Sequence, residues 1–304
     1  MSFYPSKHIV IEPGSYTTKA GFSDYQNPPT ITALTRIDQN GWKYPIVSGR
    51  VTDWIALKQL WTQILVGNLG VKLQTNQYPV LLSISSGWGR KDVERATQIL
   101  FEDLNVPGLY VVEQPLASVF GCGLSTALVI DIGHHTTTVT AVVEGTVIEL
   151  SQQTLPVGAA DIKTQSDSLD VLFRPEIVDK DTIGLHEAIQ HSINTFEVER
   201  RSVLWDSLLL VGGGCRINGI KERIEKELSV LIAASETANE HQPKDAKWVK
   251  PPEYFVALKD RMDDVSFFGA SIMAKITFVS PNTYFSKLDY AEFGPSAVFT
   301  KITA

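Results

Sequence analysis

The sequence has little cysteine and no long apolar run, and both absences restrict its class. Its 304 residues contain only two cysteines, Cys122 and Cys215, too few for a disulfide framework or for a zinc site of paired cysteines. No apolar stretch approaches the ~20 residues that a membrane-spanning helix needs. Residues 1–5 lack the charged and apolar parts of a signal peptide. We therefore expect a soluble protein of a reducing compartment, with no membrane contact.

Positive charge is also scarce. The chain has 27 lysine and arginine residues against 34 aspartate and glutamate residues, which gives a net charge of −7. A sequence-independent grip on nucleic acid needs clustered lysine and arginine. The sequence has no such cluster, so we expect no direct binding of nucleic acid. Hydrophobic residues make up 43% of the chain, enough for two lobes that each bury a core.

Two stretches far apart in the sequence share one design. In residues 9–21 an apolar run leads through Glu12 into a glycine-containing turn, and residues 128–143 repeat this plan with Asp131. Each pattern predicts a strand, a tight turn and a second strand. Such a turn can point backbone N–H groups at a phosphate, with the acid placed to organise a metal ion. An ordinary hairpin is the alternative for either stretch alone, but two of them suggest two halves that face one cleft.

A third pattern combines a strand, a glycine turn and a helix. Residues 208–211 form a predicted strand, Gly212, Gly213 and Gly214 follow it, and residues 217–228 form a predicted helix. Glycine lets a ligand approach the backbone, and a helix N-terminus favours anions. The pattern is therefore typical of a nucleotide cradle, although a plain strand-to-helix turn would look the same.

The remaining pattern alternates strands with helices. The predicted strands are residues 78–84 and 109–112. The predicted helices are one that starts at Trp54 and is capped by Thr52 or Asp53, and those over 91–105, 114–122 and 267–278. Residues 235–252 are polar and contain a proline pair, which predicts a surface loop. The alternation indicates an α/β protein with a mixed sheet.

Short motifs along nearly the whole chain resemble the actin family. Residues 44–54, YPIVSGRVTDW, resemble the actin segment with Tyr-Pro-Ile, Gly and Val-Thr-Asn-Trp. Residues 172–175, LFRP, and 184–187, GLHE, are similar to actin's Leu-Phe-Gln-Pro and Gly-Ile-His-Glu, and residues 285–296 resemble the family's C-terminal signature. The resemblance implies the actin–Hsp70–hexokinase fold, in which two related α/β domains surround a central nucleotide cleft.

The same resemblance implies where the domains lie and what is missing from them. A first domain would cover residues 1–120, with residues 272–304 packing back on it, and a second would cover 121–271. The outer subdomains look reduced, because almost nothing of one remains between Gly41 and Tyr44 and most of the other is absent between Asp161 and Leu172. Either the protein is a shortened actin or segments are absent from this sequence. In both cases the surfaces that stack one actin on the next are missing, so we expect no filament growth.

The resemblance implies a nucleotide cleft that has lost part of its design. The family's first phosphate loop is Asp-Asn-Gly-Ser-Gly, whereas residues 12–16 are Glu-Pro-Gly-Ser-Tyr. Tyr16 therefore adds a side chain where glycine allows close approach, and Pro13 removes an N–H donor. The second loop, Asp-Ser-Gly-Asp-Gly, is Asp-Ile-Gly-His-His over residues 131–135. His134 replaces an acid that Mg²⁺ prefers, unless the two histidines only form a hydrogen-bonded turn.

The expected cofactor-binding residues of this degenerate cleft are Gly14, Ser15, Lys19, Asp131, Gly133, Gly212, Gly213 and Gly214. Thr138 stands where actin has a water-positioning histidine, whereas Gln114 matches the other water-positioning residue. Phosphoryl transfer depends mainly on positioning and charge stabilisation. We therefore predict no catalytic residue, little or no ATP hydrolysis, weak or absent ATP binding, and no resident cofactor or metal.

The resemblance also implies a groove at the base of the cleft that can hold a helix. The matching positions are Phe120, Cys122, Gly123, Ile272, Met273, Ile276, Thr277, Phe278 and Tyr284. Small and apolar residues there suit a helix laid in a groove, although about half of them could equally belong to the core.

Within the family, the altered phosphate loops and the polar stretch 235–251 resemble the fungal nuclear actin-related proteins of the SWI/SNF and RSC chromatin remodellers. That resemblance implies a non-catalytic scaffold in the nucleus. It implies pairing with a second actin-related protein and binding to the long helix of the remodeller's ATPase subunit, among other complex subunits. The alternatives are an ATP-binding switch or weak ATPase of the actin fold, and a cytoskeletal actin-related capping subunit.

Overall fold

The chain divides into two compact units. The computed structural model describes residues 7–24, 29–35, 37–38, 42–165, 168–234, 245–251, 253, 256–259 and 261–302. Unit 1 comprises Met1–Gly121 and Ser266–Ala304, and unit 2 comprises Cys122–Val265. The chain therefore passes between the units twice, after Gly121 and after Val265. The resemblance implied boundaries after residues 120 and 271.

Unit 1 is built on a six-stranded mixed sheet. Its strands are β1 (Ile9–Pro13), β2 (Thr17–Phe22), β3 (Ile31–Leu34), β8 (Val80–Ile84), β9 (Gly108–Glu113) and β15 (Phe285–Ser286). Their order across the sheet is β15-β9-β8-β1-β2-β3. β1 is antiparallel to β2 and parallel to β8. The C-terminal β15 pairs with β9. Strands from both ends of the chain therefore belong to the same sheet.

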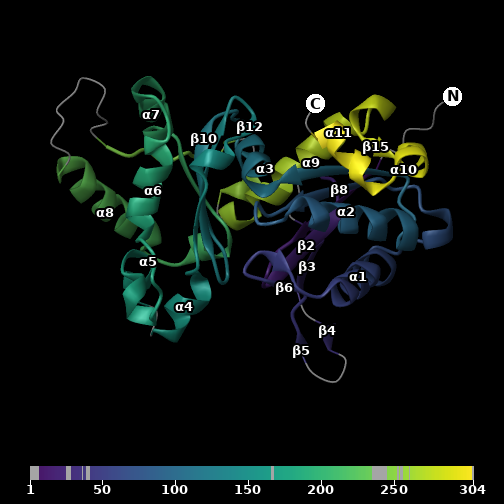
Figure 1. Ribbon diagram of the computed structural model, residues 1–304, viewed down its shortest axis with the longest axis horizontal. Coiled ribbons are helices and arrows are strands. Elements are labelled where there is room, and N and C mark those ends of the chain that lie inside the picture. The colour runs from purple at the N-terminus through teal and green to yellow at the C-terminus, as the bar shows by residue number, and fades with distance from the viewer. Residues whose placement is uncertain are drawn as a thin grey trace. The chain divides into compact units, whose positions relative to one another are not determined.

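Helices cover both faces of this sheet (Figure 1). They are α1 (Trp54–Thr62), α2 (Arg90–Gln98), α3 (Gln114–Gly121) and α9 (Val265–Thr277). Because successive strand residues point to opposite faces, Ile9 and Ile11 share a core with residues of α1 and α2. Val10 belongs to a second core with residues of α3 and α9. Unit 1 thus has three layers, as expected for an α/β protein.

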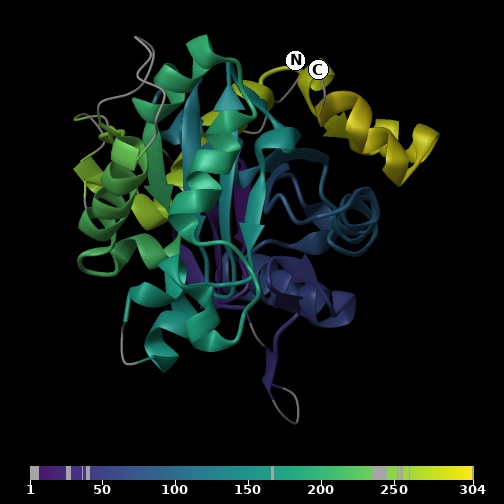
Figure 2. The same cartoon turned by 60° about the vertical axis from the view of Figure 1, so that its left-hand side comes forward.

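The ends of α1 and α2 and the small hairpins complete unit 1. Both helices continue into a π-helical turn, Gln63–Asn68 and Ile99–Asp103 respectively. A short hairpin of β4 (Ile37–Asp38) and β5 (Trp42–Lys43) extends away from the rest of unit 1 (Figures 1 and 2). It occupies the position where most of an outer subdomain was expected to be missing. The other elements are β6 (Ile46–Val47), β7 (Arg50–Val51), α10 (Lys287–Phe293) and α11 (Phe299–Ile302).

Unit 2 repeats the central arrangement of unit 1. Its strands are β10 (Ala127–Ile132), β11 (Thr137–Val143), β12 (Thr146–Val147), β13 (Gln153–Leu155) and β14 (Leu208–Val211). Their order is β12-β11-β10-β14, and β13 also pairs with β11. β10 is antiparallel to β11 and parallel to β14, as β1 is to β2 and β8. The two halves therefore share one sheet plan.

The helices of unit 2 bury their apolar sides against this sheet. They are α4 (Ala159–Thr164), α5 (Asp170–Phe173), α6 (Leu185–Asn194), α7 (Val198–Trp205) and α8 (Ile220–Ala234). Leu128 and Ile130 of β10 share a core with residues from all five helices. The helix expected over 217–228 begins three residues later and extends to Ala234. No helix in the described parts of the chain is long and apolar enough to cross a bilayer.

The predicted surface loop 235–252 is only partly a loop. Residues 235–244 and 252 lie outside the described residues. Residues 247–249 instead lie alongside β14: the N–H of Leu208 donates to the carbonyl of Lys247 at 2.9 Å, and the N–H of Val249 donates to the carbonyl of Leu208 at 2.8 Å. The indole N–H of Trp248 donates to Glu225 on α8 at 2.6 Å. The prediction from polar composition missed the contribution of Trp248, which anchors this segment to α8.

Candidate functional site

The turns of the two hairpins, β1–β2 and β10–β11, have the same internal geometry. In the first, the N–H of Gly14 donates to the carbonyl of Thr17 at 3.1 Å, and in the second the N–H of Gly133 donates to that of Thr136 at 2.9 Å. The register then places Glu12 opposite Lys19 and Asp131 opposite Thr138. The strand–turn–strand prediction is confirmed for both, and the two acids occupy equivalent positions.

In the first turn, the lysine that resembles the family's phosphate lysine is paired within the hairpin. The ammonium of Lys19 lies 3.5 Å from a carboxylate oxygen of Glu12, and the side chains are only 11% and 12% exposed. An ion pair that is largely withdrawn from water is screened much less than a surface pair. The positive charge of Lys19 is therefore balanced inside unit 1 without a phosphate.

The hydroxyl of Ser15 is also engaged. Its oxygen accepts a hydrogen bond from the N–H of Gly49 at 2.9 Å. Gly49 lies in the turn between β6 and β7 with φ +75°, a conformation that favours glycine. Beside Ser15, the carbonyl of Tyr16 accepts from the N–H of Thr35 at 2.8 Å, and the tyrosine side chain is 45% exposed. The turn is thus hydrogen-bonded to the segments that contain Gly49 and Thr35, and the Tyr16 ring lies on its surface.

In the second turn, backbone N–H groups at the start of α4 donate hydrogen bonds to the loop carbonyls. The N–H of Ala159 donates to the carbonyl of Gly133, and that of Ala160 to the carbonyl of His134, both at 2.9 Å. Gly158 is close-packed there, because a Cβ on it would lie 2.5 Å from the His134 carbonyl oxygen. N–H groups at a helix start are suited to binding anions. Here two of them are already satisfied by the loop itself.

The two histidines of this turn contact each other. The ring centroids of His134 and His135 are 4.3 Å apart. Burial lowers the pKa of His134, the neighbouring His135 and Lys163 lower it further, and Asp161 opposes them. Asp161 in turn accepts from the Gly158 N–H at 2.9 Å and pairs with Lys180 at 2.8 Å. The lowered pKa favours the uncharged imidazole of His134, which does not replace the lost carboxylate.

The glycine triplet packs against the second turn. Gly212 has φ +81°, and a Cβ on it would lie 2.0 Å from the Oδ1 atom of Asp131. A Cβ on Gly214 would lie 2.2 Å from a methyl carbon of Ile132, whereas nothing lies within 4 Å of the corresponding position on Gly213. The structure thus brings Asp131 and the triplet together within unit 2. Two of the three glycines serve this close packing, and Gly213 alone faces open space.

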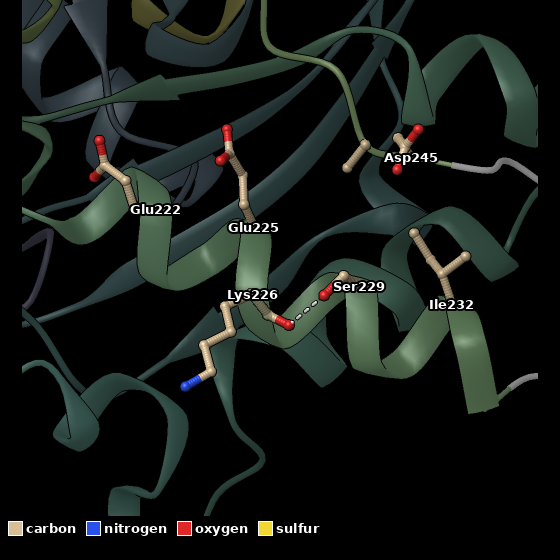
Figure 3. Close-up of a pocket in the computed structure, with 7 residues that line it drawn as sticks. Glu222, Glu225, Lys226, Ser229, Ile232 and Asp245 are labelled. Atoms are coloured by element: carbon tan, nitrogen blue, oxygen red, sulfur yellow. Dashed lines mark hydrogen bonds between the residues drawn. The ribbon is translucent and has the colours of Figure 1, made fainter.

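A separate hollow of about 460 Å³ lies on unit 2. Figure 3 shows that Glu222, Glu225, Lys226, Ser229 and Ile232 line it from α8, with Asp245 on the opposite segment. None of the expected cofactor-binding residues contributes to it. In the described ranges, no three histidine, cysteine or acidic side chains gather in a way that could hold a metal ion.

The expected partner-binding residues differ widely in exposure. Ile276 is 66% exposed at the end of α9 and Gly123 is also exposed, whereas Phe120, Ile272, Thr277 and Tyr284 are half-buried. Cys122, Met273 and Phe278 are buried, at 4%, 8% and 2% exposure.

The buried members of this set serve the core. The Phe278 ring lies between His8, at 5.2 Å, and Tyr284, at 5.1 Å between centroids. Met273 belongs to the same cluster as Phe278. Burial raises the pKa of the Cys122 thiol to about 12, so this cysteine stays protonated and unreactive. Among the apolar members, Ile276 is therefore the residue best placed to contact another protein.

Comparisons with known proteins agree with the motif pattern. A sequence model of the family described as "Actin" matches residues 32–170 and 165–303. "Actin-related protein 7" of Arabidopsis thaliana is 24% identical over 343 residues, covering 92% of this chain and 89% of that protein. "Actin-related protein 7" of Oryza sativa subsp. indica is 23% identical over 368 residues, covering 96% and 99%. Both alignments are longer than the 304 residues of the chain, so these relatives carry residues with no counterpart here.

A shorter match has a higher identity. The "SWI/SNF and RSC complexes subunit arp9" of Schizosaccharomyces pombe is 40% identical over 115 residues, which cover 38% of this chain and 22% of that protein.

Proposed function

Because the chain belongs to the actin family and has the actin fold, we propose that it is a non-catalytic, actin-related subunit of a nuclear chromatin-remodelling complex of the SWI/SNF or RSC type. The observation that carries this proposal is the 40% identity to the fission-yeast subunit named for those two complexes. At a finer level we propose that the chain is a counterpart of that ninth actin-related protein. The tail over residues 283–297 and the polar stretch 235–251 support the same assignment.

The first turn supports the absence of catalysis. A phosphate group would have to compete for Lys19 in this turn, because Lys19 is paired with Glu12. Tyr16 adds a side chain where a ligand would have to approach the backbone. With positioning impaired, little remains of the effects that accelerate phosphoryl transfer.

Titration of the purified chain with ATP and Mg²⁺ tests this part of the proposal. We expect no saturable heat signal at micromolar ATP and no release of phosphate. Tyr16→Gly removes the ring from the turn and is expected to raise ATP affinity at least tenfold, which corresponds to about 1.4 kcal/mol. Tyr44→Gly, at another exposed tyrosine of unit 1, is the matched control and should leave the affinity unchanged.

A different outcome would favour an ATP-binding switch. That alternative is supported by the retention of Lys19, Asp131 and the glycine triplet. Micromolar ATP binding by the unaltered chain would establish it in place of the scaffold proposal, and turnover at the rate of an actin would also make the chain an enzyme.

The partners follow from the same proposal. The chain would pair with a second actin-related protein, and α9 would contact the long helix of the remodeller's ATPase subunit. Ile276 near the end of α9 and Val279, two residues beyond the helix, support this because both are exposed apolar side chains, at 66% and 64%. An amphipathic helix binds such a surface through its apolar face.

The contact can be measured with the long helix of the ATPase subunit as an immobilised ligand. Ile276→Asp is expected to weaken binding at least tenfold, because it places a charge in a desolvated apolar contact. Leu288→Asp is the control: this leucine is 82% exposed on α10 but lies outside the predicted set. Phe278→Asp would not serve, because its side chain is core and the variant would unfold. Equal binding by Ile276→Asp and the unaltered chain, or co-purification with cytoskeletal motor components, would contradict the proposal.

A further inference from the structure

The second passage between the units is very short. Asp264, the next-to-last residue of unit 2, is fully buried and its carboxylate contacts the guanidinium of Arg261. Ser266, the first residue of the returning chain in unit 1, lies with its hydroxyl 3.3 Å from that of the buried Ser83 on β8. Only Val265 separates these two fixed residues, and α9 begins there. The start of α9 is therefore anchored on both sides.

On the unit 2 side the anchor is made of four charges. Asp263 lies 3.5 Å from Arg216 through one carboxylate oxygen and 3.6 Å from Arg261 through the other. Its side chain is only 10% exposed. Two adjacent carboxylates withdrawn from water are costly unless cations compensate them. Arg216 compensates Asp263, and Arg261 contacts both acids.

Arg216 comes from the glycine turn. It ends the 3₁₀ turn Gly213–Arg216, which follows Gly212 and packs on Ile132 through Gly214. The N–H of Cys215 donates to the carbonyl of Gly212 at 3.1 Å, so Arg216 is held close to the triplet. The arginine thus links a turn that lies against Asp131 to the acids that precede α9.

We propose that Arg216, Arg261, Asp263 and Asp264 form a charge clamp that ties the glycine turn to the residues that lead into α9. All four residues belong to unit 2, so the clamp holds together two segments of that unit, the glycine turn and residues 261–264. A molecule that displaces the glycine turn would therefore loosen the residues that precede α9, and a partner that holds those residues would restrict the turn, because coupling between two sites is reciprocal. The clamp does not depend on the proposed nuclear function.

Hydrogen exchange of the full chain, followed by mass spectrometry, tests the clamp. Arg216→Ala is expected to speed exchange about two- to fivefold both in the glycine turn and in residues 263–268, because a partly exposed ion pair contributes modestly. Arg216→Lys keeps the charge and should restore most of the protection. Arg200→Ala, at an exposed arginine of α7, is the control and should leave both segments unchanged.

Three results would overturn the clamp. One is an unchanged exchange rate in residues 263–268 for Arg216→Ala. Another is faster exchange in the glycine turn alone, which would show that Arg216 acts locally. The third is an Arg216→Lys variant as unprotected as Arg216→Ala, which would show that the shape of the side chain matters and its charge does not. A melting temperature recorded for each variant separates these results from general unfolding.

Discussion

Gly269→Ala is expected to destabilise unit 1 by about 3 kcal/mol or more. An added Cβ would lie 1.7 Å from the carbonyl oxygen of Ala117 and 2.7 Å from the backbone nitrogen of Gly121. Both atoms belong to the backbone of α3, so no side chain can rotate away. α3 and α9 would have to separate, and that would open the core in which Phe267 and Phe278 lie.

The free energy of unfolding, from urea titration of the fluorescence of unit 1, measures this effect. Gly67→Ala is the matched control, because its added Cβ would meet only a side-chain carbon of Gln63 at 3.8 Å. That variant is expected to stay within about 0.5 kcal/mol of the unaltered chain. Gly269→Ala with an unshifted urea midpoint would show that α3 and α9 are not in backbone contact.

Gly212→Ala is expected to cost unit 2 about 3 kcal/mol, whereas Gly213→Ala should cost less than about 1 kcal/mol. The first change combines two penalties. The backbone at φ +81° is strained for alanine by about 1–2 kcal/mol, and the Cβ would lie 2.0 Å from Asp131 and 2.7 Å from the Ile132 carbonyl oxygen. At Gly213 neither penalty applies. The neighbouring glycines therefore give a comparison in which sequence context is nearly constant.

Thermal unfolding of the two variants, monitored on unit 2, distinguishes them. Gly212→Ala should melt several degrees lower, and Gly213→Ala within a degree or two of the unaltered chain. Equal losses would mean that the triplet is needed for flexibility as a whole, and that the contact of Gly212 with Asp131 is not what requires glycine.

Local patterns sufficed to predict the two hairpins but not what packs on them. A turn bonded from Gly14 to Thr17 places Glu12 opposite Lys19 by register alone. The ion pair between them could therefore have been predicted from the sequence. The contact of Gly212 with Asp131 was not, because it depends on how β14 lies beside β10. The pairing of Arg216 with Asp263 spans 47 residues and leaves no local periodicity to detect.

The apolar composition of α9 explains why its exposure could not be predicted. Apolar side chains occur on nearly every side of the helix, so no single face is marked as buried. Ile276 and Phe278 look equivalent in the sequence, yet one is 66% and the other 2% exposed. Only the packing of Phe278 against His8 and Tyr284 decides between them, and it removes Phe278 from the candidate contact residues.

The strip of residues 247–249 beside β14 has a consequence for self-association. An open sheet edge offers free main-chain groups to a second copy, and proteins commonly guard such edges with charges, prolines or bulges. Along the edge of β14, the N–H of Leu208 already donates to the Lys247 carbonyl, and the Leu208 carbonyl already accepts from the Val249 N–H. Another molecule therefore cannot extend the sheet at Leu208, and the safeguard against fibre-like aggregation there is supplied by the chain's own backbone.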